Sequence, residues 1–150
     1  MKPIVVLDTN ILLDILVFDD ELAHPLRTAL TNQELDAVAT QQTLEELADV
    51  ISRPQFELDL QQQTNVMMQW QSWVRIVNDE DLVIAPWKCK DRDDQVFINL
   101  AFSLKPSTLI SKDKMVLKIA KRAIKEQVVI TADHEKFLSS IGRLFYCVAT

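Results

Sequence analysis

Short apolar runs alternate with longer amphipathic segments along the whole chain, and this alternation constrains the fold more than any other feature. Strands are predicted at residues 4–7, 35–39, 108–110 and 128–130, with a weaker one at 82–85. Helices are predicted at residues 11–16, 43–53, 94–104, 115–125 and 133–141, and a longer helical stretch through 66 reaches about 77. Such alternation favours right-handed crossovers, and it therefore predicts an α/β fold with a parallel sheet that helices cover on both faces.

The size of the chain bounds its organisation. With 150 residues, 48% of them hydrophobic, we expect a single domain over residues 1–150 that buries one core. No apolar run approaches the ~18 residues of a membrane span, and the amino terminus leads directly into the first strand rather than into a signal segment. Cys89 and Cys147 lie far apart and in no metal-binding spacing, which favours reduced thiols. These features predict a cytoplasmic protein without a membrane segment.

The charge of the chain limits how it can act on nucleic acid. A formal net charge of −6 argues against a protein that coats nucleic acid by charge alone. Basic residues nevertheless recur at three- and four-residue steps along one side of the predicted 115–125 helix: Lys114, Lys118, Lys121, Arg122 and Lys125. This stripe is compatible with a solvated helix face and with a surface that follows a phosphate backbone. In the second case the RNA-contacting candidates are Lys112, Lys114, Lys118 and Lys121.

Acidic residues stand where strands give way to helices. Asp8 and Asp113 each follow a buried strand, Glu46 lies in the first turn of the helix predicted from 43, and Asp94 begins another helix. Because the carboxyl ends of parallel strands meet at one edge of a sheet, we expect these four acids to lie together. Carboxylates so crowded repel one another unless some are protonated or a cation lies among them. The pattern predicts a site for Mg²⁺ or Mn²⁺ and metal-assisted hydrolysis of a phosphodiester.

Each acid also has a purely structural interpretation. Asp8 and Asp113 suit the N-cap position of the helices that follow them, and Glu46 fits the third position of a capping box with Thr43. The acidic run at 91–94 suits a solvated loop before a helix. The set is more specific than its members, because every strand-to-helix turn at the expected edge carries an acid.

No other catalytic apparatus is evident in the sequence. The chain has two histidines, His24 and His134, and neither stands beside a serine or cysteine in a recognisable nucleophile setting. Its one glycine excludes a glycine-rich phosphate-binding loop. Redox chemistry with a nucleotide cofactor and nucleoside triphosphate hydrolysis are therefore disfavoured.

Four motifs together resemble a known family. They are Val-Val-Leu-Asp8-Thr-Asn10, Glu46 within Leu-Glu-Glu-Leu-Ala-Asp-Val-Ile-Ser-Arg-Pro, Cys89-Lys-Asp91-Arg-Asp93-Asp94-Gln-Val-Phe97, and Leu-Ile-Ser111-Lys-Asp113-Lys. In order and spacing they are similar to the four acidic motifs of PIN domains, above all the bacterial and archaeal toxin components of toxin–antitoxin pairs. The likeness extends over nearly the whole chain. The family commonly has proline at Arg92, an acid at Gln95 and glycine at Lys112.

The resemblance implies a three-layer α/β/α sandwich around a parallel sheet and Mg²⁺- or Mn²⁺-dependent endoribonuclease activity. It also implies homodimers and a small antitoxin partner that blocks the site. Carried over by residue, it makes Asp8, Glu46, Asp94 and Asp113 the metal-binding acids, supported by Asn10 and Ser111. Asp91 and Asp93 are additional candidates at the third motif.

Two other functions remain open at this point. A haloacid-dehalogenase-like phosphatase also begins with a strand that ends in aspartate and uses Mg²⁺, but it needs an acid two residues later, where this chain has Asn10. A non-catalytic module that binds RNA or a protein partner would use the acids only as helix caps.

Overall fold

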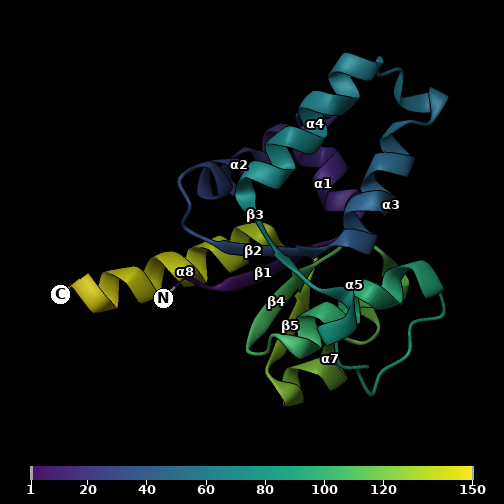
Figure 1. Cartoon of the computed structure of the whole chain (residues 1–150). Coiled ribbons are helices and arrows are strands. Elements are labelled where there is room, and N and C mark those ends of the chain that lie inside the picture. Colours follow the sequence, from purple (N-terminus) through teal and green to yellow (C-terminus); the bar gives the residue numbers. More distant parts are fainter. Residues whose placement is uncertain (1, 150) are drawn as a thin grey trace.

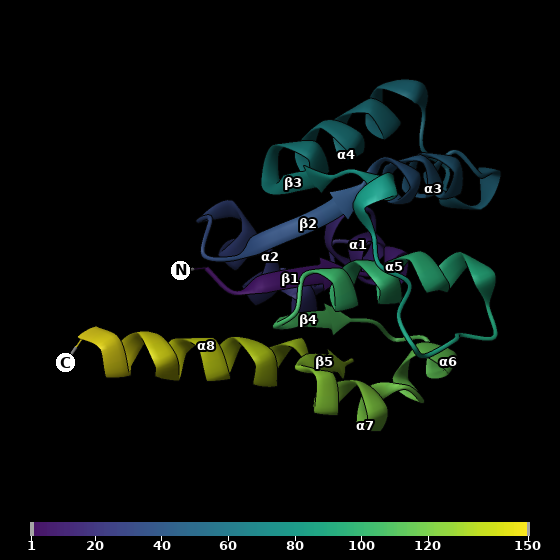
Figure 2. The same cartoon turned by 60° about the horizontal axis from the view of Figure 1, so that its bottom comes forward.

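Five parallel strands form the centre of the molecule (Figures 1 and 2). The computed structural model describes the backbone of residues 2–149 and the side chains of residues 2–141. The strand order in the sheet is β3-β2-β1-β4-β5, and all neighbouring pairs are parallel. The strands are β1 (Ile4–Leu7), β2 (Asp36–Thr40), β3 (Val74–Val77), β4 (Ser107–Ile110) and β5 (Val128–Thr131). The predicted parallel sheet is confirmed, and the four clearest apolar runs are strands within a residue of their predicted bounds.

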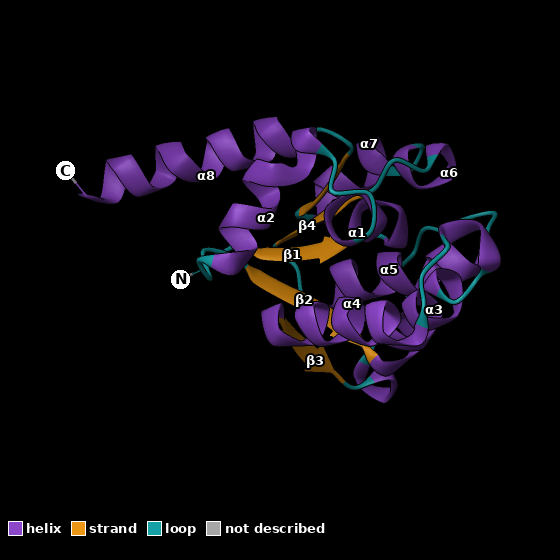
Figure 3. Ribbon diagram, turned by 90° about the horizontal axis from the view of Figure 1, so that it is seen from above, coloured by secondary structure: helices purple, strands orange, loops and turns teal. Residues whose placement is uncertain are grey.

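Helices cover both faces of the sheet, which confirms the three-layer α/β/α class (Figures 1 and 3). One face carries α1 (Thr9–Leu16), α2 (His24–Thr31), α3 (Gln41–Ile51), α4 (Leu60–Trp73) and the beginning of α8 (His134–Ala149). The other face carries α5 (Arg92–Ser103), α6 (Lys114–Leu117) and α7 (Ala120–Ala123). Side chains alternate along β1, so that Val5 and Leu7 enter the first core and Val6 enters the second.

The strand order reverses between β1 and β4. The chain proceeds from β1 outward to β2 and β3, and then returns across the sheet to β4 and β5 on the other side of β1. The two loops that leave the carboxyl ends of β1 and β4 therefore lead to helices on opposite faces of the sheet. In open parallel sheets this reversal point is where ligands bind.

The structure corrects the long helix predicted to reach 77. Helix α4 ends at Trp73, and Val74–Val77 is the edge strand β3. Valines and isoleucine in this short run favour extended backbone because their branched side chains are restricted in a helix. Arg75 also binds Asp36 of β2 through two hydrogen bonds of 3.1 and 2.9 Å. The helical spacing of Val66, Trp70 and Trp73 continued by chance to Val77 and concealed the boundary.

The weak strand predicted at 82–85 is wrong. This segment is a loop, in which Val83 and Ile84 are exposed and only Ala85 is buried. Its backbone is bonded by side chains of α5 rather than by another strand: Val83 N–H donates to Ser103 and Ala85 N–H donates to Asn99. An apolar run without a neighbouring strand has no ladder to join, which the sequence alone does not reveal.

Three further helices differ from the predictions. The predicted 115–125 helix is broken at Ile119, whose N–H donates to Val116 O three residues earlier instead of four as in an α-helix. The two pieces are α6 and α7, which bury Val116 and Ala123 respectively. The last helix continues through Gly142 to Ala149 instead of ending at Ile141. Helix α2 was not predicted at all, although Pro25 stands in its first turn.

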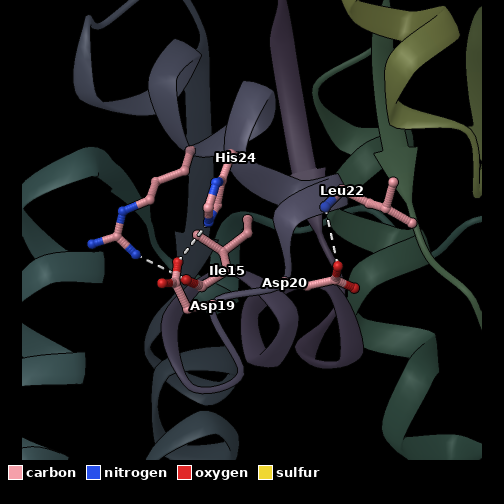
Figure 4. A network of polar contacts seen from close by, with 6 residues as sticks. Ile15, Asp19, Asp20, Leu22 and His24 are labelled. Atoms are coloured by element: carbon pink, nitrogen blue, oxygen red, sulfur yellow. Dashed lines mark hydrogen bonds and ion pairs between the residues drawn. The ribbon is translucent and has the colours of Figure 1, made fainter.

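The turn between α1 and α2 is held by its own polar groups (Figure 4). His24 Nε2 lies 2.9 Å from Asp19 Oδ1, and Leu22 N–H donates to Asp20 Oδ1 at 3.0 Å. Asp19 has a positive φ of 47°, and three other non-glycine residues of the described chain share this left-handed backbone: Gln33, Glu57 and Gln127. Sharp turns are therefore made without glycine.

Two predictions about the chain as a whole have different outcomes. Cys89 is a free, half-buried thiol, whereas Cys147 lies outside the residues whose side chains the structure describes. Within the described part of the chain, no helix combines the length and apolar character needed to cross a bilayer.

Candidate metal centre and active site

Asp8 is fixed at the reversal point by two hydrogen bonds. It directly follows β1, caps α1 and is 3% exposed. Its Oδ1 accepts from Thr9 N–H at 2.7 Å, and its Oδ2 accepts from the Ser111 hydroxyl at 2.6 Å. Ser111 is itself fully buried after β4, and its Oγ accepts from Asp113 N–H at 3.0 Å. The Ser111 hydroxyl group therefore fixes the position of Asp8 relative to Asp113.

Three carboxylates meet closely beside Asp8. Asp91, Asp94 and Asp113 each offer an oxygen atom, and these atoms lie within 4.8 Å of one another. Asp91 caps α5, Asp94 lies in the first turn of that helix, and Asp113 caps α6 through a 2.7 Å bond from Met115 N–H. Asp94 is 8% exposed, and its Oδ2 is buried with no hydrogen-bond partner. The structure thus adds Asp91, a less certain candidate in the sequence, to the closest group of acids.

Glu46 is linked to Asp8 through Thr9 and is not one of the three closest carboxylates. It is half-buried on α3, and its Oε2 accepts a 3.1 Å hydrogen bond from the Thr9 hydroxyl. The capping box predicted for Glu46 and Thr43 is wrong: Thr40 is the N-cap of α3, and Thr43 is its reciprocal partner. Because α3 begins at Gln41, Glu46 stands in its second turn, and its carboxylate is free of any capping role.

Asp93 faces a different region from its neighbours. It is exposed in the first turn of α5 and, with Glu46, lines an open groove of about 190 Å³ between α3 and α5. The remaining lining residues of this groove are Gln42, Asp49, Arg53 and Val96. Asp93 therefore lies at an approach to the site rather than among the three closest carboxylates.

Burial and mutual repulsion raise the pKa values of three acids at the site, Asp94, Asp8 and Glu46. Burial raises the pKa of Asp94 to about 8, together with the charge of Asp8 and with both a side-chain hydrogen bond and the charge of Asp113. Burial also raises the pKa of Asp8, against the lowering effect of its bonds from Ser111 and Thr9. For Glu46 burial again raises the pKa, and the bond from Thr9 opposes it. Among the described residues, no lysine or arginine lowers the pKa of any of these three acids, so no side-chain cation of this part of the chain balances them.

The donor set fits a hard divalent cation. The close group consists only of carboxylate oxygens, which Mg²⁺ and Mn²⁺ prefer over nitrogen or sulfur ligands. The buried, unpartnered Oδ2 of Asp94 is the kind of group that a bound ion would satisfy.

Asn10 and Lys112 link the two loops that surround the site. Asn10 Oδ1 accepts a 3.1 Å hydrogen bond from Lys112 N–H. The Lys112 ammonium group lies 2.6 Å from Asp14 Oδ2 on α1, so its charge is already engaged. The predicted support from Asn10 is thus a bond between α1 and the loop after β4.

The other lysines predicted to contact RNA are all exposed. Lys114 lies in α6, Lys118 at its carboxyl end and Lys121 in α7, so the break at Ile119 interrupts the stripe expected on one continuous helix. Within residues 2–141, none of these three lysines forms an ion pair.

Two contributors were not identified from the sequence. Thr9 bridges Asp8 and Glu46 by donating from its backbone to one and from its hydroxyl to the other. Its place between Asp8 and Asn10 was the available signal. For Asp14, which binds Lys112, the only signal in the sequence was its position one helical turn after Asn10.

The comparisons with known proteins agree with this architecture. A sequence model of the PIN domain matches residues 4–115, which is more than half of the chain. The chain belongs to the PIN domain family. No curated protein is a significant sequence match.

Solved structures share the fold of this PIN domain at low sequence identity. A chain of the VapBC2 complex from Rickettsia felis, crystallised with a DNA fragment from its promoter, matches with a TM-score of 0.56 and 15% identity. The match covers 87% of this chain and 99% of that one. The RRP44 PIN domain of T. brucei matches with a TM-score of 0.52 and 10% identity over 99% of this chain and 86% of that one.

The raised pKa of Asp94 predicts how stability depends on pH in the absence of metal. Because the folded state binds this proton more tightly than the unfolded state does, stability falls as pH rises from about 4 to about 8. Asp94→Asn removes the titration, so its stability should fall less over this range and exceed that of the wild type near pH 8. Urea unfolding in chelator at several pH values measures the free energy of unfolding of the wild type and of Asp94→Asn. Exposed Asp81→Asn serves as the control. Parallel curves for the wild type and Asp94→Asn would contradict this assignment.

Proposed function

We propose that this PIN domain is a metal-dependent endoribonuclease that hydrolyses RNA phosphodiester bonds, and that it is the toxin of a toxin–antitoxin pair. The observation that carries the proposal is the group of Asp91, Asp94 and Asp113 beside Asp8, gathered without a compensating cation from residues 2–141. Helix capping explains single acids, but it gives no reason to bury Asp94 Oδ2 without a hydrogen-bond partner.

In this proposal Asp8, Glu46, Asp94 and Asp113 hold Mg²⁺ or Mn²⁺, and Asp91 joins them. When bound, the ion supplies positive charge to the phosphate and lowers the pKa of a water molecule that can attack it. Ser111 and Thr9 keep the Asp8 carboxylate in place, and Asn10 keeps the loop of Asp113 against α1. Asp93 lies in the groove beside Glu46, along which the substrate strand can approach.

Electrostatics then determine where RNA can bind. The net charge of −6 repels a polyanion over most of the surface, so attraction must be local. Exposed Lys114, Lys118 and Lys121 follow Asp113 in the chain and carry no ion pair among the described residues. We propose that these three lysines contact the RNA backbone beside the acids, while Lys112 mainly secures α1.

The assembly of the protein is also a proposal. The fold likeness to a chain of VapBC2 supports a small antitoxin partner that covers the acidic site. A homodimer and a cytoplasmic location remain predictions. The family match favours a PIN nuclease over a haloacid-dehalogenase-like phosphatase. A non-catalytic module stays the second candidate, because Asp8, Asp91 and Asp113 all cap helices.

Melting with and without metal separates these two candidates. Crowded carboxylates should bind Mn²⁺ in the folded state only, so Mn²⁺ at about 100 times its Kd should add about 2.7 kcal/mol of stability relative to chelator. Acids that serve only as caps should be indifferent to the ion. Calorimetric melting of the wild type and Asp94→Asn measures the effect, and the variant should gain much less. If the wild type melts at the same temperature in Mn²⁺ and in chelator, the result favours the non-catalytic module.

Asp8→Asn should keep the fold and remove the activity. Asparagine caps helices as well as aspartate does, but it lacks the charge, so Mn²⁺-dependent cleavage of single-stranded RNA should fall by about 100-fold or more. Asp59→Asn is the matched control, because Asp59 also caps a helix, α4, away from the acids. Full metal-dependent cleavage by Asp8→Asn would remove Asp8 from the mechanism.

Charge reversal tests the RNA-contacting lysines. Lys118→Glu with Lys121→Glu should weaken RNA binding and flatten its salt dependence, by about 0.7 in the log–log slope for each phosphate group that the protein no longer neutralises. Binding of labelled RNA to the inactive Asp8→Asn protein at several salt concentrations measures both quantities. Lys2→Glu is the control, because Lys2 is exposed just before β1, at the amino ends of the strands and away from the acids. If the double reversal behaves as the control does, the lysines are only a solvated surface.

A further inference from the structure

We infer that Gln95 is a positioning residue that holds the loop before α5 in place, so that Asp91 joins the metal-binding carboxylates. This inference rests on the proposed function. The side chain of Gln95 is bonded to the loop of residues 83–91 and to Asn99 rather than to any carboxylate of the site.

All polar groups of the Gln95 side chain are used. Its Oε1 accepts from Cys89 N–H at 2.7 Å, and its Nε2 donates to Trp87 O and to Asn99 Oδ1, each at 3.0 Å. The set requires one acceptor and two donors, which among side chains of this size only a carboxamide provides. A glutamate here would place a carboxylate oxygen against two other oxygens. The loop is therefore matched to glutamine and not to the acid.

Gln95 belongs to a row of three polar residues on one side of α5. Gln95, Asn99 and Ser103 follow at four-residue steps, which places them above one another on the helix. Asn99 Oδ1 accepts from Ala85 N–H at 2.9 Å, and Ser103 Oγ accepts from Val83 N–H at 2.7 Å. Each side chain thus binds the loop backbone at a different height, and Gln95 is the member next to the acids.

These hydrogen bonds matter because the loop ends at Asp91. That residue is exposed, and its carboxylate lies within reach of those of Asp94 and Asp113, so the three groups repel one another once they are ionised. Its capping bond to Asp93 N–H, 3.0 Å long, orients the carboxylate relative to α5. The bonds from Gln95 to Trp87 and Cys89 hold the preceding chain, which sets the direction from which Asp91 enters the helix. Without them, repulsion can be relieved by moving Asp91 outward.

Metal affinity tests the inference without depending on catalysis. Gln95→Leu keeps the size of the side chain and removes all three bonds, so Mn²⁺ binding measured by calorimetry should weaken by about 10-fold or more, as for other residues that orient metal ligands. Ser103→Ala is the matched control, because it removes the same kind of bond from the distant end of the row, and it should bind Mn²⁺ as the wild type does. Unchanged affinity in a folded Gln95→Leu protein would overturn the inference.

Gln95→Glu distinguishes a positioning residue from a missing ligand. If position 95 only lacks a ligand charge, the added carboxylate should tighten Mn²⁺ binding. If Gln95 acts through the loop, binding should not tighten, because the carboxylate cannot donate to Trp87 O and Asn99 Oδ1. Tighter binding would overturn the inference. This variant has nearly the size of the wild type and also serves if Gln95→Leu does not fold.

A double-mutant cycle tests whether the effect passes through Asp91. Asp91→Asn keeps the cap and removes the charge. In that background Gln95→Leu should not weaken Mn²⁺ binding further, since residues that act through one another are not additive. Fully additive effects would show that Gln95 acts independently of Asp91 and would overturn the inference.

Hydrogen exchange separates failure of this inference from failure of the proposed function. The Cys89 amide should exchange slowly in the wild type and at least about 10-fold faster in Gln95→Leu, while the Val83 amide should respond to Ser103→Ala instead. A wild type that binds no Mn²⁺ would overturn the metal site, whatever the exchange rates are. Equal exchange of Cys89 in both proteins would overturn the role of Gln95, even where Mn²⁺ binds.

Discussion

The hydrogen bond from Ser111 to Asp8 holds the candidate site together. It joins the ends of β1 and β4 where the strand order reverses, so the two loops that diverge from that point remain in a fixed relation. The same hydroxyl oxygen accepts from Asp113 N–H, and Thr9 extends the network to Glu46. Acids from three distant parts of the chain are thereby placed by neutral donors, none of which cancels their charge.

The dual use of the acids explains how such a group is tolerated in the folded protein. Asp8, Asp91 and Asp113 each begin a helix, so the free N–H groups of α1, α5 and α6 point toward the same region. These N–H groups stabilise negative charge but do not neutralise it. Asp94 has no such compensation for its buried oxygen, and it keeps its proton to higher pH. Capping and the proposed metal binding are therefore complementary demands on the same residues.

The sequence predicted the fold where the signals are local. Continuous apolar runs such as Ile4–Leu7 end at polar turns, and the acids at those ends belong to one edge of any parallel sheet. It failed where long-range contacts decide: Val74–Val77 is a strand because β2 lies beside it, and residues 82–85 are a loop because α5 binds their backbone. The place of Asp91 in the acidic group depends on the same loop. Gln95 appeared only as a departure from a family pattern, because its loop partners are backbone groups that no motif records.

The left-handed turns of this chain have a consequence for its unfolded state. Asp19, Gln33, Glu57 and Gln127 adopt backbone angles that glycine accepts freely, and each costs the native protein some local strain. Glycine, however, has the largest conformational freedom to lose on folding. A chain whose one glycine lies inside a helix samples fewer unfolded conformations, and this smaller entropy loss partly offsets the strain at its turns.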